Sequence, residues 1–194
     1  MAGSVSPAAA AGGGASPRVI PVWDPLVRLI HWSLALVILL NGFVTDPEGE
    51  LHETLGYVAL ALVLTRLCWG LIGPRPARLI SFPPSPARAL RHLGALRAGD
   101  RSVHLTHNPL GALMVWNIWA TVLLIVATGI MMGSPRFFGV SWVEDMHEIL
   151  FNWLLFSVIL HIAGVIFDTW RTGVPLVRAM IDGKKRIPAD RPIE

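Results

Sequence analysis

The sequence predicts an all-α integral membrane protein, a bundle of four transmembrane helices with both termini in the cytoplasm. Its residues are 53% hydrophobic and only 15% charged, whereas charged residues make up about 25% of a typical soluble protein. Four apolar segments are each long enough to cross a bilayer, which takes about 20 residues of helix. Basic residues are concentrated in two of the connecting and terminal segments, which indicates how the chain is oriented.

The expected spans are separated by short polar or proline-containing segments. They lie near residues 25–44, 52–72, 109–132 and 143–168. A soluble four-helix protein is the alternative, but its helices would carry a polar face. Residues 33–40 and 149–167 carry almost none, so the composition favours the membrane.

The starts of three spans carry recognisable capping signals. Asp24-Pro25 opens the first span and Asn108-Pro109 opens the third, each joining a capping side chain to a proline suited to the first turn. Ser141 and Glu144 have the spacing of a capping box before the fourth span. These signals predict helices that begin at or next to these positions.

Orientation follows from the 16 Lys and Arg residues, of which only Arg136 falls in a connection expected to face outward. Because Lys and Arg accumulate on the cytoplasmic side, we expect both termini there, in a bacterial inner membrane. The outward connections are instead acidic: they hold Asp46, Glu48, Glu50, Glu53, Glu144, Asp145 and Glu148.

The chain divides into three expected regions. Residues 1–20 are predicted to form a disordered cytoplasmic tail, 21–180 the four-helix membrane domain, and 181–194 a basic cytoplasmic tail. Within the domain, residues 84–99 place arginines and leucines at helical spacing. This stretch is either a helix on the lipid surface, held by anionic headgroups, or a solvated basic loop.

Histidines within the apolar segments are the candidate functional residues. His147 and His161 stand 14 residues apart in the fourth segment, which places them on nearly the same helix face about 21 Å apart along the axis. Strongly polar groups inside a membrane span are rare and need partners or cofactors. One helix therefore offers two potential ligands at two depths.

Comparing depths in antiparallel spans pairs these histidines with two others. His31 lies about 9 Å and His161 about 10 Å from the cytoplasmic ends of their spans. His52 and His147 both lie near the outer ends. The four residues thus form two layers of two, one near each surface.

Two nitrogen ligands per layer suit a haem, whose ring leaves two axial positions on the iron. A structural zinc ion would need four protein ligands, which the inner layer lacks. Filling both axial positions favours electron transfer over oxygen activation, and two such centres would form an electron path across the membrane. Alternatively, each histidine hydrogen-bonds to a neighbouring helix. His92, His104 and His107 are interpreted as interfacial or capping residues.

Two arginines are candidates to bind the propionates of a haem. Arg66 follows His52 by 14 residues, which places it about 21 Å deeper, near the inner layer. Arg28 lies about one helical turn before His31. A buried guanidinium paired with a carboxylate is far less costly than an isolated one. The alternative for Arg66 is that it extends to the lipid headgroups.

From about Val22 to Lys185 the chain resembles the prokaryotic cytochrome b561 family and the related b-type cytochrome subunits of nickel–iron hydrogenases. The first two spans share Val22-Trp23-Asp24-Pro25 with Arg28, His31 and Trp32, then His52 with Gly56-Tyr57, then Arg66 with Trp69-Gly70. The last two share His107-Asn108-Pro109-Leu110-Gly111-Ala112, Thr128-Gly129, His147 and His161. The resemblance implies a four-helix bundle with two b haems, ligated by His31, His52, His147 and His161.

The resemblance also implies electron exchange with the quinone pool. The leading hypothesis is a di-haem b-type cytochrome relaying electrons between a periplasmic-side donor, such as a basic soluble cytochrome, and quinone, as an electron-transfer protein or quinone reductase. The alternative is a membrane anchor that relays electrons for a periplasmic hydrogenase or dehydrogenase. A histidine-based metal or proton transporter has less support. A homodimer is compatible with the glycine-containing helix faces, and no nucleic-acid partner is expected.

Overall fold

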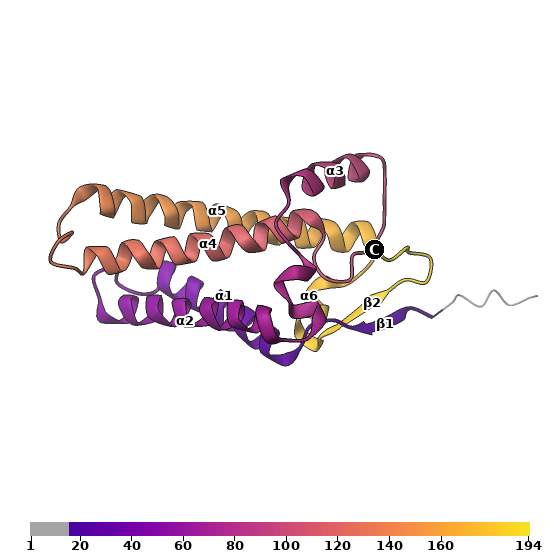
Figure 1. The fold of residues 1–194 in the computed structure, drawn as a ribbon, viewed down its shortest axis with the longest axis horizontal. Helices are drawn as coiled ribbons and strands as arrows, with labels where there is room; N and C mark the ends of the chain where they lie inside the picture. The colour runs from indigo at the N-terminus through magenta and orange to yellow at the C-terminus, as the bar shows by residue number, and fades with distance from the viewer. Residues whose placement is uncertain (1–15) are drawn as a thin grey trace, which may run out of the picture.

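Four long helices form the body of the protein in a computed structural model that describes residues 16–194 (Figure 1). They are α1 (Pro25–Phe43), α2 (Glu50–Ile72), α4 (Pro109–Met132) and α5 (Ser141–Thr172). All four are long and apolar enough to cross a membrane, which confirms the expected bundle of four membrane-spanning helices. Most of the expected N-terminal tail, residues 1–15, lies outside the described part.

The helices pack as two hairpins. Figure 1 shows α1 beside α2 and α4 beside α5, and α4 also packs against α2. The shared core is built from small and branched apolar side chains on facing helix surfaces, with Val63 of α2 fully buried and Val122 of α4 3% exposed. Outward-facing leucines, isoleucines and aromatic rings remain exposed along the helices, as expected for surfaces that contact lipid.

Two of the three capping predictions are confirmed. The carboxylate of Asp24 accepts a hydrogen bond from the backbone N–H of Val27 at 3.0 Å, and the Asn108 amide oxygen accepts one from Gly111 N–H at 2.8 Å. The predicted capping box of α5 is wrong, because Ser141 is already the first helical residue and the N-cap is Val140, which has no capping side chain.

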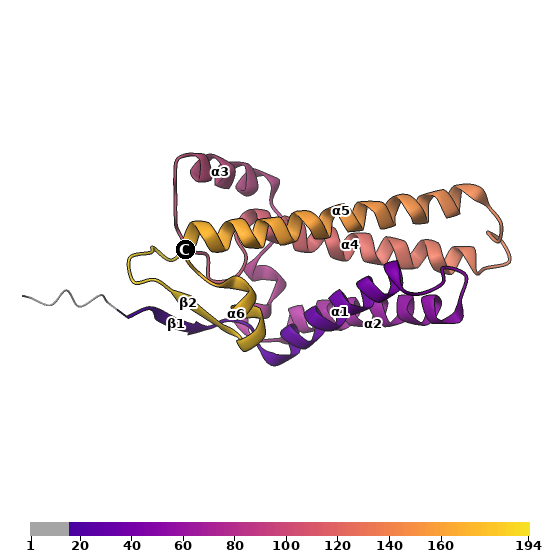
Figure 2. The ribbon, with the colours of Figure 1, turned by 180° about the vertical axis from the view of Figure 1, so that it is seen from behind.

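The remaining elements gather at one end of the bundle, here called the sheet end. They are β1 (Arg18–Pro21), α3 (Pro86–Arg97), α6 (Leu176–Asp182), β2 (Lys184–Ile187) and two short 3₁₀ turns at Arg75–Ala77 and Leu79–Ser81 (Figure 2). The opposite end, here called the hairpin end, consists of the α1–α2 and α4–α5 connections, residues 44–49 and 133–140.

Residues 86–97 form a helix, as one of the two interpretations of this stretch expected.

The two segments expected to be tails pair with each other in the part that the structure describes. β1 and β2 form an antiparallel ladder in which Arg18 faces Ile187 and Pro21 faces Lys184. Ile187 is fully buried with Val103 and Val174 in a second apolar cluster. These short segments contain apolar as well as basic residues, and burial of Ile187 and partial burial of Ile20 offset the cost of ordering the strands.

Hydrogen bonds from Lys185 link β2 to the segment that precedes α4. Its ammonium group donates hydrogen bonds to the carbonyl oxygens of His104 at 2.9 Å and Thr106 at 2.8 Å. Burial lowers the pKa of Lys185 to about 8, so the group is still protonated at neutral pH. The adjacent Lys184 is exposed.

We predict that Lys185→Met destabilises the sheet end, because the two carbonyls lose their donor while the apolar stem is retained. The expected cost is about 2 kcal/mol, seen as a lower unfolding temperature in detergent. Lys184→Met is the matched control on the same strand and should leave that temperature within experimental error. Equal effects of the two substitutions would show that the buried ammonium contributes nothing specific.

Candidate haem-binding site

The inner histidine pair joins the first and last spans. His31 of α1 and His161 of α5 face each other with ring centroids 6.4 Å apart and an interplanar angle of 54°. Neither residue forms a hydrogen bond across the pair, and the Nδ1 atom of His31 is buried without a partner among the described residues. The structure therefore brings together the two residues whose depths match in the sequence.

The outer pair has nearly the same geometry. His52 of α2 and His147 of α5 have ring centroids 6.3 Å apart and an interplanar angle of 57°. Both histidines of α5 thus take part in a pair, each with a partner from a different helix of the other hairpin. Helix α5 is the element common to both layers.

These separations fit one metal ion held between two imidazoles. With metal–nitrogen bonds of about 2 Å on either side, two ring centroids lie about 6 Å apart. Within residues 16–194 no group of three or more His, Cys, Asp or Glu side chains converges as a metal site. The donor set in each layer is therefore two nitrogens, which suits the two axial positions of a haem.

A threonine hydroxyl orients His147. The Thr128 hydroxyl lies 2.8 Å from the carbonyl oxygen of Ile125, to which it donates, and 2.9 Å from Nδ1 of His147. Its oxygen then accepts a hydrogen bond from the Nδ1–H of His147. That arrangement leaves the Nε2 lone pair as the ligand atom, the usual role of a hydrogen-bonded partner behind a metal-binding histidine.

Thr45 has the same role behind His52. Its hydroxyl donates to the carbonyl oxygen of Asn41 at 3.0 Å and lies 3.4 Å from Nδ1 of His52. His147 and His52 are therefore each oriented by a threonine whose hydroxyl proton is donated to a backbone carbonyl oxygen. Both contacts join a histidine to a neighbouring segment, as the hydrogen-bonding alternative expects, and both leave the Nε2 atom of the ring available to a metal.

Two glycines lie close to the layers, at positions where a side chain would meet open space. Gly164 follows His161 by three residues and Gly56 follows His52 by four, so each shares a helix face with its histidine. A Cβ atom added to either glycine would meet nothing within 4 Å. Gly129 is different, because an added Cβ would lie 3.4 Å from the His147 ring, so this glycine lets α4 approach that ring.

Arg66 does not extend to the surface. It is 4% exposed, its NH2 atom donates to the Ala77 carbonyl oxygen at 2.9 Å, and its guanidinium lies 5.1 Å from the Trp119 ring centroid. Its NH1 atom is buried and has no hydrogen-bond partner among residues 16–194. Arg28 donates to the carbonyl oxygen of Ile181 while its Nε atom is also buried and unpaired.

The three histidines outside the pairs are not caps. His107 lies between Trp23 and Phe82, with centroid distances of 5.0 and 4.6 Å. His92 of α3 lies against His104, with ring centroids 5.1 Å apart. The capping interpretation fails because Asn108 performs that function at α4 and long-range packing buries the histidine rings.

Several contacts around the pairs have no signal in the sequence. Thr128 and Thr45 belong to this group, as does Asn117, whose amide donates to Ser157 at 2.8 Å and accepts from Trp153 at 3.0 Å. A polar bond of this kind ties α4 to α5 inside the membrane. The sequence motif Thr128-Gly129 includes one of these residues, but the motif does not indicate what the threonine hydroxyl contacts.

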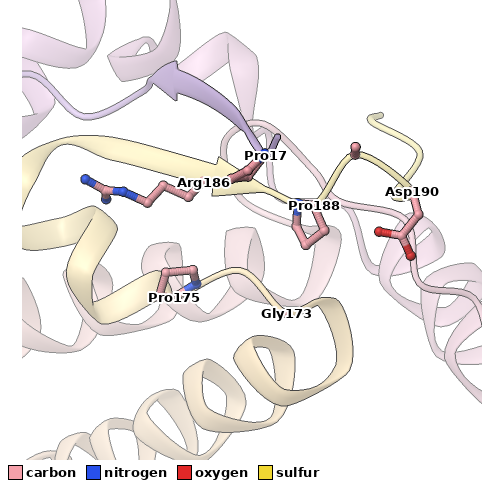
Figure 3. Close-up of a pocket in the computed structure, with 7 residues that line it drawn as sticks. Pro17, Gly173, Pro175, Arg186, Pro188 and Asp190 are labelled. Atoms are coloured by element: carbon pink, nitrogen blue, oxygen red, sulfur yellow. The ribbon is translucent and has the colours of Figure 1, made fainter. Parts of the chain in front are cut away.

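A hollow at the sheet end lies away from these pairs. Figure 3 shows it beside the β1–β2 ladder, lined by Pro17, Gly173, Pro175, Arg186, Pro188, Ala189 and Asp190. None of the four paired histidines lines it. It is open to solvent and rich in proline, so it is not the redox site.

Four membrane-spanning helices with two facing imidazole pairs define a membrane cytochrome. A family model described as prokaryotic cytochrome b561 matches residues 22–183, most of the chain. The protein therefore belongs to the prokaryotic cytochrome b561 family, and it is a multi-pass, b-type haem electron-transfer protein of a membrane. A search of curated proteins gives no significant match.

We predict that Thr128→Val weakens haem binding at the outer pair about tenfold, because His147 loses the acceptor that orients its ring. Haem titration of the apoprotein measures the affinity. Thr121→Val is the matched control: Thr121 is equally buried in α4, but its hydroxyl donates to its own helix at Asn117. Unchanged affinity in Thr128→Val would remove the assigned role of this hydroxyl.

Proposed function

We propose that this protein is a di-haem b-type cytochrome of the bacterial inner membrane that transfers electrons between a periplasmic-side donor and the quinone pool. The observation that carries the proposal is the presence of two imidazole pairs with centroid separations of 6.4 and 6.3 Å. Their α5 members are 14 residues apart, which corresponds to about 21 Å along the helix. With two redox centres at that spacing, an electron would cross the membrane in several short transfers rather than in one long one.

Each layer has a defined set of ligands in this proposal. His31 and His161 hold the inner haem, and His52 and His147 hold the outer one. A bound haem supplies a one-electron redox centre at each layer. With two imidazoles in each layer to hold it, a haem would be suited to electron transfer rather than to binding oxygen or substrate. The residues of the chain bind the haems, orient the ligand rings and exclude water.

Arg66 and Arg28 are proposed to bind the propionates of the inner haem. Each has a buried guanidinium nitrogen without a hydrogen-bond partner, NH1 in Arg66 and Nε in Arg28. A buried, unpaired guanidinium nitrogen is costly, and a carboxylate would satisfy it with a charge-assisted hydrogen bond. Both arginines lie on the helices that carry His52 and His31, in their sheet-end halves.

The distribution of charge supports an orientation with both termini in the cytoplasm. The sheet end holds the basic connections and strands, whereas the hairpin end and the adjoining starts of α2 and α5 hold seven exposed carboxylates and one arginine, Arg136. Those carboxylates belong to Asp46, Glu48, Glu50, Glu53, Glu144, Asp145 and Glu148. An acidic periplasmic surface would attract a basic donor such as a soluble cytochrome.

We predict that the rate of reduction by a small basic cytochrome falls steeply as ionic strength rises, because salt screens the attraction to the hairpin end. Stopped-flow absorbance at the haem band measures this rate. The double variant Glu144→Gln, Asp145→Asn should be slower at low salt and should converge with the wild type at high salt. A rate independent of salt would reject a basic donor and leave the haem assignment intact.

We further predict that His161→Ala and His52→Ala each bind one haem per chain, whereas the wild type binds two, because each substitution removes one ligand from a different layer. Pyridine haemochrome absorbance and protein concentration give the stoichiometry. His104→Gln, which alters a histidine outside both pairs, should retain both haems. Retention of two haems in His161→Ala or His52→Ala would refute the assigned pairing.

A further inference from the structure

A second cavity opens at the sheet end, between α3 and the first turn of α4, which pack together (Figure 1). Its volume is about 450 Å³, within the range of about 300–1,000 Å³ that is typical of binding sites for small molecules. Phe82, Leu105 and Ala112 contribute apolar surface to it. Phe82 and Ala112 belong to the buried core of the bundle, whereas Leu105 is exposed. The cavity therefore lies between that core and the surface.

One end of a membrane-spanning helix borders this cavity. Pro109 and Ala112, in the first turn of α4, are among its lining residues. Helix α4 has 24 residues, which corresponds to about 36 Å along the helix axis. The hydrocarbon core of a bilayer is only about 30 Å thick. The first turn of α4 therefore reaches the head-group region, where a phospholipid carries its phosphate.

Helix α3 presents hydrogen-bond donors to the cavity. Arg88, Arg91 and His92 all line it. His92 is only 7% exposed, and its Nε2 atom is buried without a hydrogen-bond partner among residues 16–194. An unpaired buried polar group destabilises a fold, so this atom indicates a ligand that is still to be bound. Two guanidinium groups and an imidazole N–H are donors suited to a phosphate.

His104 and Glu194 present acceptors to the same cavity. Burial lowers the pKa of His104, so its ring is neutral at pH 7. Its Nε2 atom lies 3.2 Å from the carboxylate of Glu194, which accepts the Nε2–H and leaves Nδ1 as an acceptor. That Nδ1 atom is buried and has no partner within the described residues. A ring lone pair beside a carboxylate suits a ligand group that carries N–H donors.

The formal charges around the cavity cancel. Arg88 and Arg91 contribute two positive charges, and Asp100 and Glu194 two negative ones. The carboxylate of Asp100 already accepts hydrogen bonds from the backbone N–H of Ser102 at 2.9 Å and from its hydroxyl at 2.7 Å. Glu194, which is exposed, is the carboxylate that a ligand can reach. A purely anionic head group would meet these carboxylates without a cation to offset them, whereas a zwitterion matches both signs.

We propose that this cavity binds the head group of phosphatidylethanolamine, a phospholipid that carries a phosphate and a primary ammonium group. The phosphate accepts hydrogen bonds from Arg88, Arg91 and the Nε2–H of His92. The ammonium group donates to Glu194 and to Nδ1 of His104. The acyl chains remain in the bilayer beside the bundle. This site rests on the four-helix membrane fold and on the cavity, and not on the assignment of the haems.

The first test compares lipids with identical acyl chains on the haem-loaded, full-length protein in detergent. Native mass spectrometry gives a dissociation constant for each lipid. We expect phosphatidylethanolamine to bind about tenfold more tightly than phosphatidylcholine, whose methylated ammonium has no N–H, and than phosphatidylglycerol, which has no ammonium. Inorganic phosphate and glycerophosphoethanolamine, the head group without acyl chains, should bind at least about tenfold more weakly than the lipid, because neither buries apolar surface.

The second test changes the charged groups one at a time. Arg91→Gln should weaken binding of phosphatidylethanolamine about tenfold, because the phosphate loses a charge-assisted hydrogen bond. Arg97→Gln is the matched control: Arg97 is an exposed arginine of the same helix but lies outside the lining of the cavity, so this variant should bind like the wild type. Glu194→Gln should lower the affinity for phosphatidylethanolamine to that for phosphatidylcholine. Haem content should be normal in all three variants.

The outcomes decide each part of the proposal. If phosphatidylcholine or phosphatidylglycerol binds the wild type as tightly as phosphatidylethanolamine, the ammonium group is not recognised and the proposal is wrong. Equal affinities of Arg91→Gln and Arg97→Gln would show that the lipid does not occupy this cavity. Binding of inorganic phosphate or of the free head group as tight as that of the lipid would overturn a lipid as the ligand. Haem stoichiometry, which tests the proposed function, is measured separately.

Discussion

Two pairs of facing imidazole rings constrain the whole arrangement of this bundle: one joins the antiparallel helices α1 and α5, and the other joins the parallel helices α2 and α5. A histidine in lipid is costly unless its nitrogens have partners, and α5 carries two of them on one face. The α1–α2 hairpin must therefore present His31 and His52 at the same two levels. The lengths of the spans and the positions of the connections follow from that requirement, because a shift of one helical turn would separate both pairs.

The two layers are supported differently. At the outer layer, Thr128 and Thr45 accept from the Nδ1–H groups of His147 and His52, so neighbouring helix residues set the ring orientation. At the inner layer, support comes from packing and charge, with Arg66 buried among Phe82 and Trp119. The β1–β2 ladder and Lys185 hold the segment before α4 against this region. These elements therefore pack together at the sheet end, which is the end of the bundle nearer to the inner pair.

Residue patterns predict the local features of this molecule well. Long apolar runs identify all four spans, Asp24 and Asn108 mark two helix starts, and counting residues along antiparallel spans pairs the four histidines correctly. Contacts between distant segments are the part that patterns miss. The β1–β2 ladder joins residues more than 160 positions apart. Ser141 resembles an N-cap in the sequence, but the N-cap of α5 is the preceding residue, Val140. The roles of Thr128, Thr45 and His92 depend on neighbours that only the packed helices bring close.

Electron paramagnetic resonance of the oxidised, haem-loaded protein tests the central claim most directly, because the signal of ferric haem reports its axial ligands. Two bis-imidazole centres per chain predict two low-spin ferric signals of equal intensity and no high-spin signal. A substantial high-spin signal, or a single low-spin centre accounting for all the iron, would contradict the assignment of both imidazole pairs as haem ligands.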